Sequence, residues 1–383
     1  TVEDLEANPD SPTGRMLAHP LSHTGTPQRR VKLNDPELKT VVFRGVHARN
    51  LQIDEITVPL QRFTVVTGVS GSGKSTFCRE VLFENLSRRL KDAQAPLAGT
   101  DQLTGFENVG RVLEVDQTPI GKNSRSCPAT YIGIMTAIRD LYAATNEAQA
   151  RGYDASRFSF NKAVGACPVC AGQGLRTVEM NFLPDVKVLC EACAGKRFNP
   201  ETLEVLWRGK SIGDVLEMEI DEAVDFFASM PSIAYPLKLM QDVGLGYLTL
   251  GQPPPTLSGG EAQRLKLVTE LAKVRTDGSF AARAPHTLYV LDEPTVGLHM
   301  TDVDRLSKVL SRLVDAGSTV VVIEHNLDIA ADADWIIDLG PEGGAKGGKV
   351  VAQGSPKMVA RKNTATGIVL RAFLAEHKPV KSA

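Results

Sequence analysis

The chain has 383 residues, 42% of them hydrophobic, a length that allows two or three domains, each with a core that needs no disulfides. No stretch approaches the roughly 20 uninterrupted apolar residues of a bilayer-spanning helix, so a membrane role would require a separate subunit. The 43 basic and 45 acidic side chains give a formal charge of −2, so any contact with nucleic acid must use local basic patches.

Residues 1–39 are rich in Pro, Ser, Thr and Asn and show no sustained helical or strand period. Their acidic, polar start lacks the basic and apolar regions of a signal peptide, which predicts a cytoplasmic protein. Residues 7–17 resemble residues 360–370, with the Ala, the Thr-Gly pair and the Leu at equal offsets. We therefore interpret residues 1–39 as the tail of a preceding, similar module and a linker, which would make the chain the second half of a tandem protein.

An α/β pattern begins at residue 40 and returns in the last third of the chain. Apolar, β-branched runs predict buried strands at residues 40–46, 51–60, 63–68, 288–292 and 318–325. Residues 302–317 are apolar at helical spacing and end in Gly317, a residue typical of the position after a helix. We expect residues 40–90 and 256–360 to form one ATPase core, residues 91–255 to be an insertion, and residues 361–383 to be a tail.

The sequence GVSGSGKST at residues 68–76 fits the pattern GxxxxGK[ST] between a predicted strand and a predicted helix, the context that this motif requires. In such a loop, small residues let backbone N–H groups approach phosphates, the lysine reaches the β and γ oxygens, and the serine binds Mg²⁺. An ordinary glycine turn is the alternative for the pattern alone. The predicted nucleotide-binding residues of this loop are Gly68, Ser70, Gly71, Gly73, Lys74, Ser75 and Thr76.

Two other predicted strands end in residues suited to nucleotide hydrolysis. Asp292 ends the run LYVLD, where its carboxylate can hold Mg²⁺, and Glu293 is the candidate to orient or deprotonate the attacking water. His325 ends the run VVVIEH, where it could contact a γ-phosphate. The alternatives are a solvated strand end for the acidic pair and a structural role for the histidine.

The segment LSGGEAQR, residues 257–264, predicts a second helix N-terminus suited to an anion, opened by Ser258, Gly259 and Gly260. It resembles the signature sequence of ATP-binding-cassette (ABC) ATPases, and the other motifs follow in that family's order. Gln117, in VDQTPIGK, resembles the family's Q-loop glutamine. The resemblance implies an α/β ABC nucleotide-binding domain of the P-loop NTPase class with an inserted α-helical signature domain. It also implies ATP, Mg²⁺ and a second module, because the signature of one module faces the P-loop of another.

Four of the six cysteines form two CxxC pairs separated by nineteen residues, a spacing typical of a zinc ribbon at about residues 160–200. In a reducing cytosol, paired cysteines indicate a metal site before a disulfide. Four protein ligands leave no open position, so the zinc would be structural. Redox chemistry is the alternative. The predicted ligands are Cys167, Cys170, Cys190 and Cys193.

Over nearly its whole length the chain resembles the C-terminal half of the UvrA family, the damage-recognition ATPases of bacterial nucleotide excision repair. The resemblance is carried by DQTPIGKNSRSCPATYIG, CPVCAGQG, CEACAGKRFNPETLEV, TLSGGEAQR, DEPTVGLH and VVVIEHNLDIAADADWIIDLGPEGG. It implies ATP-dependent binding of distorted duplex DNA, dimerisation and hand-over to a UvrB-like helicase. The chain departs from the family at Cys127, Val296 and Ala166, the last where a basic residue is usual, so a paralogue that gives tolerance to DNA-binding drugs is an alternative.

Residues 117–139 and 155–178 contain basic but no acidic side chains and could meet phosphates, with duplex shape rather than base sequence read out. A solvated basic face is the alternative. The candidate DNA contacts are Lys122, Arg125, Arg157, Lys162 and Arg176. Two other functions compete with DNA repair: the ATPase subunit of a membrane exporter, disfavoured by the zinc insertion, and a DNA-binding module that is weakly active or inactive as an ATPase by itself.

Overall fold

The computed structural model describes residues 1–33, 35–121, 125–178, 186–273 and 286–378, in two compact units. Unit 1 comprises residues 1–116 and 273–383, and unit 2 comprises residues 117–272. The division therefore falls elsewhere than the expected boundaries at residues 91 and 255. The physical reason is that residues 100–115 add a strand to each sheet of unit 1, whereas the signature helix packs among the helices of unit 2.

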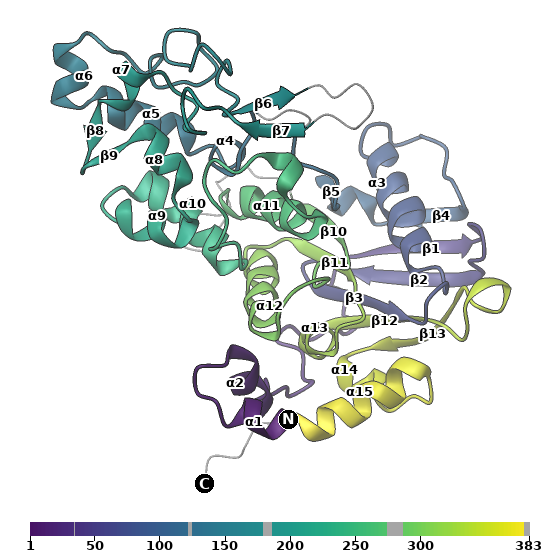
Figure 1. Cartoon of the computed structure of the whole chain (residues 1–383). Helices are drawn as coiled ribbons and strands as arrows, with labels where there is room; N and C mark the ends of the chain where they lie inside the picture. Colours follow the sequence, from purple (N-terminus) through teal and green to yellow (C-terminus); the bar gives the residue numbers. More distant parts are fainter. Residues whose placement is uncertain (34, 122–124, 179–185, 274–285, 379–383) are drawn as a thin grey trace. The chain divides into compact units, whose positions relative to one another are not determined.

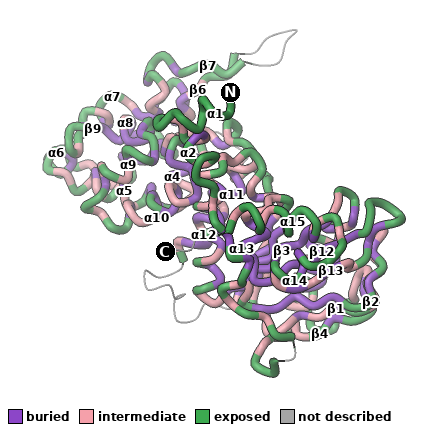
Figure 2. The backbone as a smooth tube through the Cα atoms, turned by 90° about the horizontal axis from the view of Figure 1, so that it is seen from below, coloured by how far each residue is buried: buried purple, intermediate pink, exposed green. Residues whose placement is uncertain are grey.

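Unit 1 is built around a six-stranded, mostly parallel sheet (Figure 1). Its strands are β3 (Phe63–Gly68), β5 (Arg111–Val115), β10 (Thr287–Asp292), β11 (Thr319–Ile323), β12 (Trp335–Gly340) and β13 (Lys349–Gly354). Their order is β13-β12-β3-β11-β10-β5, and β13 alone among them runs antiparallel to its neighbour. Every residue of β3, β11 and β12 is buried, as predicted for strands covered on both faces; Figure 2 shows β3 and β12 in the colour of buried residues.

A second, antiparallel sheet of unit 1 has the order β2-β1-β4, with β1 at Thr40–Val46, β2 at Ile53–Pro59 and β4 at Thr100–Thr104. One apolar core joins this sheet, the six-stranded sheet and the helix η1 (Thr76–Phe83), which has the wide hydrogen-bonding pitch of a π-helix. The rings of Phe43 and Phe77 meet edge to face in this core, with centroids 6.2 Å apart. The helix that carries the P-loop is thereby fixed against both sheets.

The remaining helices of unit 1 follow the strands. The helix α12 (Met300–Asp315) buries Val303, Leu306 and Leu310 and packs on β11 and β3, and Gly317 follows it with φ +94°, so the predicted helix and its ending are confirmed. The others are α3 (Glu84–Arg89), α13 (Leu327–Asp332), α14 (Pro356–Val359) and α15 (Ala365–Glu376), with single turns η2 (Phe106–Asn108) and η4 (Gly344–Lys346).

The N-terminal residues contain two short helices that their composition did not predict, α1 (Val2–Glu6) and α2 (Pro12–Ala18). The sequence repeat noted above is also a structural one. The Ser11 Oγ accepts a hydrogen bond from the Gly14 N–H at the start of α2, and the Thr364 Oγ1 accepts one from the Gly367 N–H at the start of α15, both at 3.0 Å. In both cases the hydroxyl caps the first turn of the helix.

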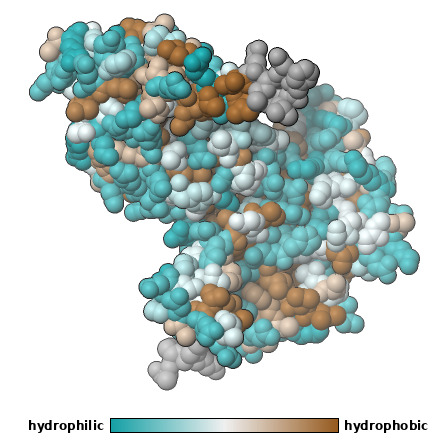
Figure 3. Space-filling view, viewed as in Figure 1, coloured by the Kyte–Doolittle hydropathy of each residue, from teal (hydrophilic) through white to brown (hydrophobic). Residues whose placement is uncertain are grey.

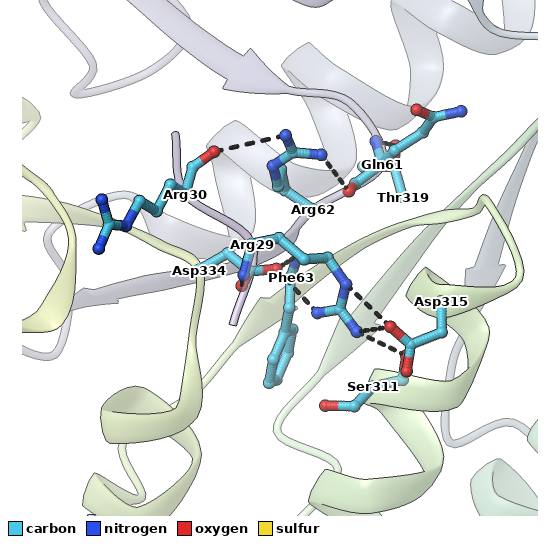
Figure 4. Close-up of polar contacts among 9 residues, drawn as sticks. All are labelled: Arg29, Arg30, Gln61, Arg62, Phe63, Ser311, Asp315, Thr319 and Asp334. Carbon is cyan, nitrogen blue, oxygen red and sulfur yellow. Dashed lines mark hydrogen bonds and ion pairs between the residues drawn. The ribbon is translucent and has the colours of Figure 1, made fainter. Parts of the chain in front are cut away.

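Residues 19–30 are attached to the core by buried polar contacts of His23 and Arg29, and those of Arg29 are drawn in Figure 4. The Arg29 guanidinium contacts the fully buried Asp334, which directly precedes β12. Asp334 also accepts a hydrogen bond from the N–H of Phe63 at the start of β3. The His23 ring lies between the carboxylates of Asp328 and Asp332 on α13, at 2.9 and 2.8 Å. The segment is therefore held at the amino ends of the parallel strands and along α13.

Unit 2 is mainly helical. Its helices are α4 (Pro128–Tyr131), α5 (Met135–Ala143), α6 (Asn146–Ala150), α7 (Pro200–Leu203), α8 (Ile212–Glu217), α9 (Ile220–Phe226), α10 (Pro231–Asp242) and α11 (Gly259–Leu271), with a single turn, η3 (Pro254–Thr256). Two hairpins interrupt them: β6 (Leu175–Val178) with β7 (Val186–Leu189), and β8 (Leu206–Trp207) with β9 (Lys210–Ser211). In the described part of the chain, no helix has the length and apolar character needed to span a membrane.

Candidate nucleotide site and metal centre

The P-loop follows β3 and begins where that strand ends, at Gly68. Gly68, Gly71 and Gly73 adopt φ values of +136°, +76° and +101°, the region that glycine enters without strain. A Cβ at Gly68 would lie 2.0 Å from the Leu339 carbonyl oxygen, so no larger residue fits there. Ser70, Gly71 and Ser75 are exposed, whereas Ser72 is buried. The loop therefore offers its backbone to an anion, as its sequence predicts.

Lys74 is nearly buried, and its Nζ donates to the carbonyl oxygens of Gly68 and Val69 at 2.9 and 3.0 Å. Burial lowers the pKa of Lys74, while the negative charges of Glu293 and Asp292 oppose that shift. A lysine held across the mouth of a glycine loop, with carboxylates nearby, provides a fixed positive charge where phosphates would bind.

Asp292 ends β10 beside the P-loop helix. The Arg79 guanidinium, on η1, contacts the Oδ2 of Asp292 at 3.1 Å and the Oε1 of Glu114 at 2.6 Å. Burial raises the pKa of Asp292, and Arg79 partly offsets this effect. Arg79 thus links the P-loop helix, the strand β5 and the predicted magnesium ligand, a connection that the sequence motifs did not reveal.

Glu293 and His325 follow neighbouring strands, β10 and β11, and their side chains are 3.7 Å apart at Oε1 and Nε2. Both are about half exposed, so water can reach them. Glu293 has φ +44°, a strained value for a residue with a side chain, and such strain is concentrated at functional sites. The structure therefore brings together Glu293 and His325, two of the three predicted catalytic side chains, and the third, Gln117, lies in unit 2.

The buried acid Glu324 was not predicted, yet it connects these two loops. Its Oε1 accepts the N–H and hydroxyl of Thr295 at 2.8 and 2.6 Å, and its Oε2 accepts the N–H groups of His325 and Asn326 at 2.9 and 3.1 Å. Only 2% of Glu324 is exposed. A charged residue directly before the histidine, at the end of an apolar strand, was the sequence signal for it.

The signature residues lie in unit 2, where Ser258 caps α11. The Ser258 Oγ accepts the Glu261 N–H at 3.3 Å, and the Glu261 carboxylate accepts the Ser258 N–H at 2.7 Å and the Tyr247 hydroxyl at 2.5 Å. Gln117, also in unit 2, lies beside the signature: a Cβ at Gly259 would be 3.1 Å from its Oε1. Gly259 and Gly260 are the first two residues of α11.

The four paired cysteines converge in unit 2, and their sulfur atoms all lie within 4.8 Å of one another. The Cys167–Cys190 and Cys170–Cys193 sulfur distances are 3.9 and 3.7 Å. Four sulfurs at about 2.3 Å from a tetrahedral zinc would be about 3.8 Å apart, so the residues present fit that ion.

Backbone groups support this metal centre. The Gly174 N–H donates to the Cys170 Sγ at 3.3 Å. Burial raises the pKa of Cys193 to about 12. Burial also acts to raise the pKa of Cys190, but hydrogen bonds, including those from backbone N–H groups, outweigh that effect and lower this pKa. The glycines that follow the two CxxC pairs all adopt positive φ: Gly172 at +78°, Gly174 at +74° and Gly195 at +86°.

The candidate DNA contacts differ in their surroundings. Arg125, Lys162 and Arg176 are exposed. Arg157 is engaged in protein contacts, because it donates to the Thr202 Oγ1 at 2.9 Å and stacks over the Tyr153 ring at 4.5 Å. Lys122 lies outside the described residues. The pattern of charged residues in the sequence does not distinguish an exposed arginine from one, such as Arg157, whose side chain is held by contacts within the unit.

The chain was compared with known proteins. No family model matches it. The UvrABC system protein A of Thermus thermophilus is 53% identical over 98% of this chain and 38% of that protein, and the Bacillus subtilis protein of the same name is 48% identical over 99% and 38%. The structure of UvrA2 from Deinococcus radiodurans matches with a TM-score of 0.81 and 44% identity, over 97% of this chain and 43% of that one.

The mixed sheet, the P-loop and the likeness to the UvrA2 structure define an α/β fold of the ABC ATPase type. The chain belongs to the UvrA family, to which it is about 50% identical over almost all of its length. It spans about two fifths of the length of these relatives.

Proposed function

We propose that the chain is an ATP-hydrolysing module of UvrA-type nucleotide excision repair that binds distorted duplex DNA. The observation that supports this most directly is the arrangement of Lys74, Asp292, Glu293 and His325 at the carboxyl ends of three adjacent parallel strands. Ligands of open α/β sheets bind at that edge. The family to which the chain belongs supports the repair function.

In this proposal the P-loop backbone and Lys74 bind the phosphates of ATP. Asp292 and Ser75 would hold Mg²⁺, which neutralises charge on the β- and γ-phosphates when bound. Glu293 orients the attacking water and accepts its proton, and His325 contacts the γ-phosphate. Water attack breaks the bond between the γ-phosphorus and the β–γ bridging oxygen, giving ADP and phosphate. Glu324 holds the loops of Glu293 and His325 in fixed positions relative to each other.

The signature residues Ser258, Gly259 and Gly260 bind the γ-phosphate of a nucleotide held by a second module, which would be a UvrA-like module of the same polypeptide or of a dimer. The capping of α11 supports this role, because the Glu261 N–H donates to the Ser258 Oγ and the Ser258 N–H donates to the Glu261 carboxylate, which leaves the glycine N–H groups at an anion-favouring helix start. Gln117, which lies beside Gly259, would have the role of the family's Q-loop glutamine.

The four cysteines hold a structural Zn²⁺ that fixes the root of the β6–β7 hairpin. Every described residue of this hairpin apart from Leu175 is exposed, and Figure 3 shows apolar surface over it, where Val178, Val186, Val188 and Leu189 lie. Arg125, Lys162 and Arg176 would contact DNA phosphates, with duplex shape read instead of base sequence. The further partner is a UvrB-like helicase, and the expected location is the cytoplasm.

The exporter interpretation is not favoured, because the relatives at about 50% identity are UvrA proteins.

The test is ATP binding and hydrolysis by three variants of the chain. Lys74→Ala should weaken ATP binding about 10- to 100-fold, because a charge-assisted contact is lost. Glu293→Gln should bind ATP normally and lose hydrolysis about 10²- to 10⁴-fold. Lys308→Ala, an exposed lysine on α12, is the control and should match the parent. Equal turnover by the Gln variant and the parent would remove Glu293 from its role. DNA affinity that does not fall with salt would contradict the DNA part of the proposal.

A further inference from the structure

A second glycine-rich loop, residues 340–348 with the sequence GPEGGAKGG, lies against the P-loop and has no part in the mechanism above. The Gly344 N–H donates to the Gly71 carbonyl oxygen at 3.0 Å, and the Gly348 N–H donates to the Ser72 carbonyl oxygen at 3.2 Å. Two consecutive carbonyl groups of the P-loop, those of Gly71 and Ser72, therefore accept hydrogen bonds from the backbone of this loop.

Asn50, in the connection between β1 and β2, joins the two loops. Its Nδ2 donates to the carbonyl oxygens of Gly71 and Gly344, both at 3.1 Å. Its own carbonyl oxygen would lie only 1.9 Å from a Cβ at Gly348, and the Gln52 N–H donates to the Gly348 carbonyl oxygen at 2.8 Å. The side chain and the backbone of this short segment thus contact the second loop at its middle, Gly344, and at its last residue, Gly348.

These contacts determine where the P-loop N–H groups point. In a planar trans peptide, the N–H of a residue points opposite to the carbonyl group before it. The Ser72 carbonyl faces the second loop, so the Gly73 N–H points away from that loop. The Ser70 carbonyl oxygen also faces this loop, 2.5 Å from the position of a Cβ on Gly343, so the Gly71 N–H is turned in the same direction.

We propose that Asn50 and the loop 340–348 act as positioning residues that keep the P-loop amides directed at the nucleotide phosphates. This inference rests on the proposed ATP binding. ATP affinity then depends on residues that touch no nucleotide. The role also explains Gly343, whose φ of −89° suits any residue but whose missing side chain makes room for the Ser70 carbonyl.

Two glycines separate this role from general stability. At Gly343 an alanine costs no backbone strain but places its Cβ 2.5 Å from the Ser70 oxygen. At Gly317, which follows α12, an alanine meets nothing within 4 Å but must adopt φ +94°, a strained value. Gly343→Ala should therefore disturb the P-loop, whereas Gly317→Ala should lower stability and leave the P-loop unchanged. Asn50→Ala removes the amide bridge without adding an atom.

The experiment is a titration of the full chain with ATP and Mg²⁺, followed by measurement of kcat, KM and the urea unfolding midpoint for the parent and the three variants. We expect Gly343→Ala and Asn50→Ala to raise Kd and KM about 10-fold with kcat nearly unchanged, and Gly317→Ala to stay within about 3-fold of the parent. If both Gly343→Ala and Asn50→Ala bind ATP as the parent does, this inference is overturned and the proposed ATP binding stands. An equal loss of ATP affinity in Gly317→Ala would also overturn the inference, because general destabilisation would then explain the effect. A parent that binds no ATP would overturn the proposed function and this inference together.

Discussion

Replacement of Arg29 by Gln should destabilise unit 1 strongly, although Arg29 is far along the chain from most residues that it contacts. The guanidinium donates to Asp334 at 3.0 Å and to the Ser311 carbonyl oxygen at 3.1 Å, and it also contacts Asp315 (Figure 4). Asp334 is fully buried, so its charge has no access to water when this partner is removed.

The magnitude follows from what Asp334 retains. Its carboxylate would still accept the N–H groups of residue 29 and Phe63, both at 2.9 Å, but no positive charge would remain in contact with it. Breaking a buried ion pair on one side costs about 3–5 kcal/mol. The retained N–H bonds place the expected loss near the lower figure, about 3 kcal/mol. The contact with Asp315 adds little, because that side chain is 62% exposed.

Urea unfolding followed by fluorescence and circular dichroism measures this loss, and Arg44→Gln provides the matched control. Arg44 also pairs with one carboxylate, that of Glu55 at 2.7 Å, but both side chains are about half exposed. The control should cost less than about 1 kcal/mol. The unfolding slope should be unchanged in both variants, since neither alters the surface exposed on unfolding. A loss below 1 kcal/mol for Arg29→Gln, or equal losses in the two variants, would refute the reasoning.

Three other predictions address the metal centre, a buried histidine and the catalytic loops. Cys193→Ser should abolish stoichiometric zinc binding, measured by metal analysis, and lower the unfolding midpoint of unit 2; a parent chain whose four thiols react freely would contradict the zinc assignment. Burial acts to lower the pKa of His23, but Asp328 and Asp332 raise it from its ordinary 6.5 to about 9. The protonated ring therefore stabilises the fold fully below pH 6.5, and about 2–3 kcal/mol should be lost as pH rises through 9. His23→Asn should flatten the unfolding free energy over this window, and an unchanged slope would exclude His23 as the cause. Glu324→Gln should cost about 1–3 kcal/mol and lower kcat more than it raises KM, because an amide faces N–H groups that need an acceptor; unchanged turnover would remove its positioning role.

The parts of the fold that could be predicted were those whose burial leaves a pattern in the sequence. The runs at 40–46 and 63–68 match β1 and β3 at both ends. β3 is buried throughout and needs continuous apolar residues, whereas β1 buries its apolar residues Val41, Phe43 and Val46 and exposes Arg44. The strands β4 and β5 were missed, since TDQLT and RVLEV are only partly buried. The helix α1 has no buried residue and depends on the Thr1 cap, so no apolar period exists to predict it.

In the candidate site too, the residues that could be predicted differ physically from those that could not. Motifs predicted the groups that would meet the nucleotide, because the chemistry restricts both residue type and spacing at Lys74, Asp292 and Glu293. They did not predict Glu324, Arg79 or Asn50, which act through other protein groups. A contact such as that of Asn50 with a loop nearly 300 residues away arises from the fold alone. The four cysteines were predictable because metal ligands must converge and their spacing is local within each pair.

A substitution near one end of β3 should therefore change a different property of the protein from a substitution near the other end. The amino end is held by Asp334 and Arg29, and the carboxyl end opens into the P-loop at Gly68. Six residues at about 3.3 Å each separate these ends by roughly 17 Å of strand buried on both faces. Substitutions that far apart with no shared partner add independently. Arg29→Gln combined with Gly343→Ala should therefore give the sum of the two stability losses, with the ATP affinity of Gly343→Ala alone. A loss of affinity beyond that value would mean that β3 transmits a change from one end to the other.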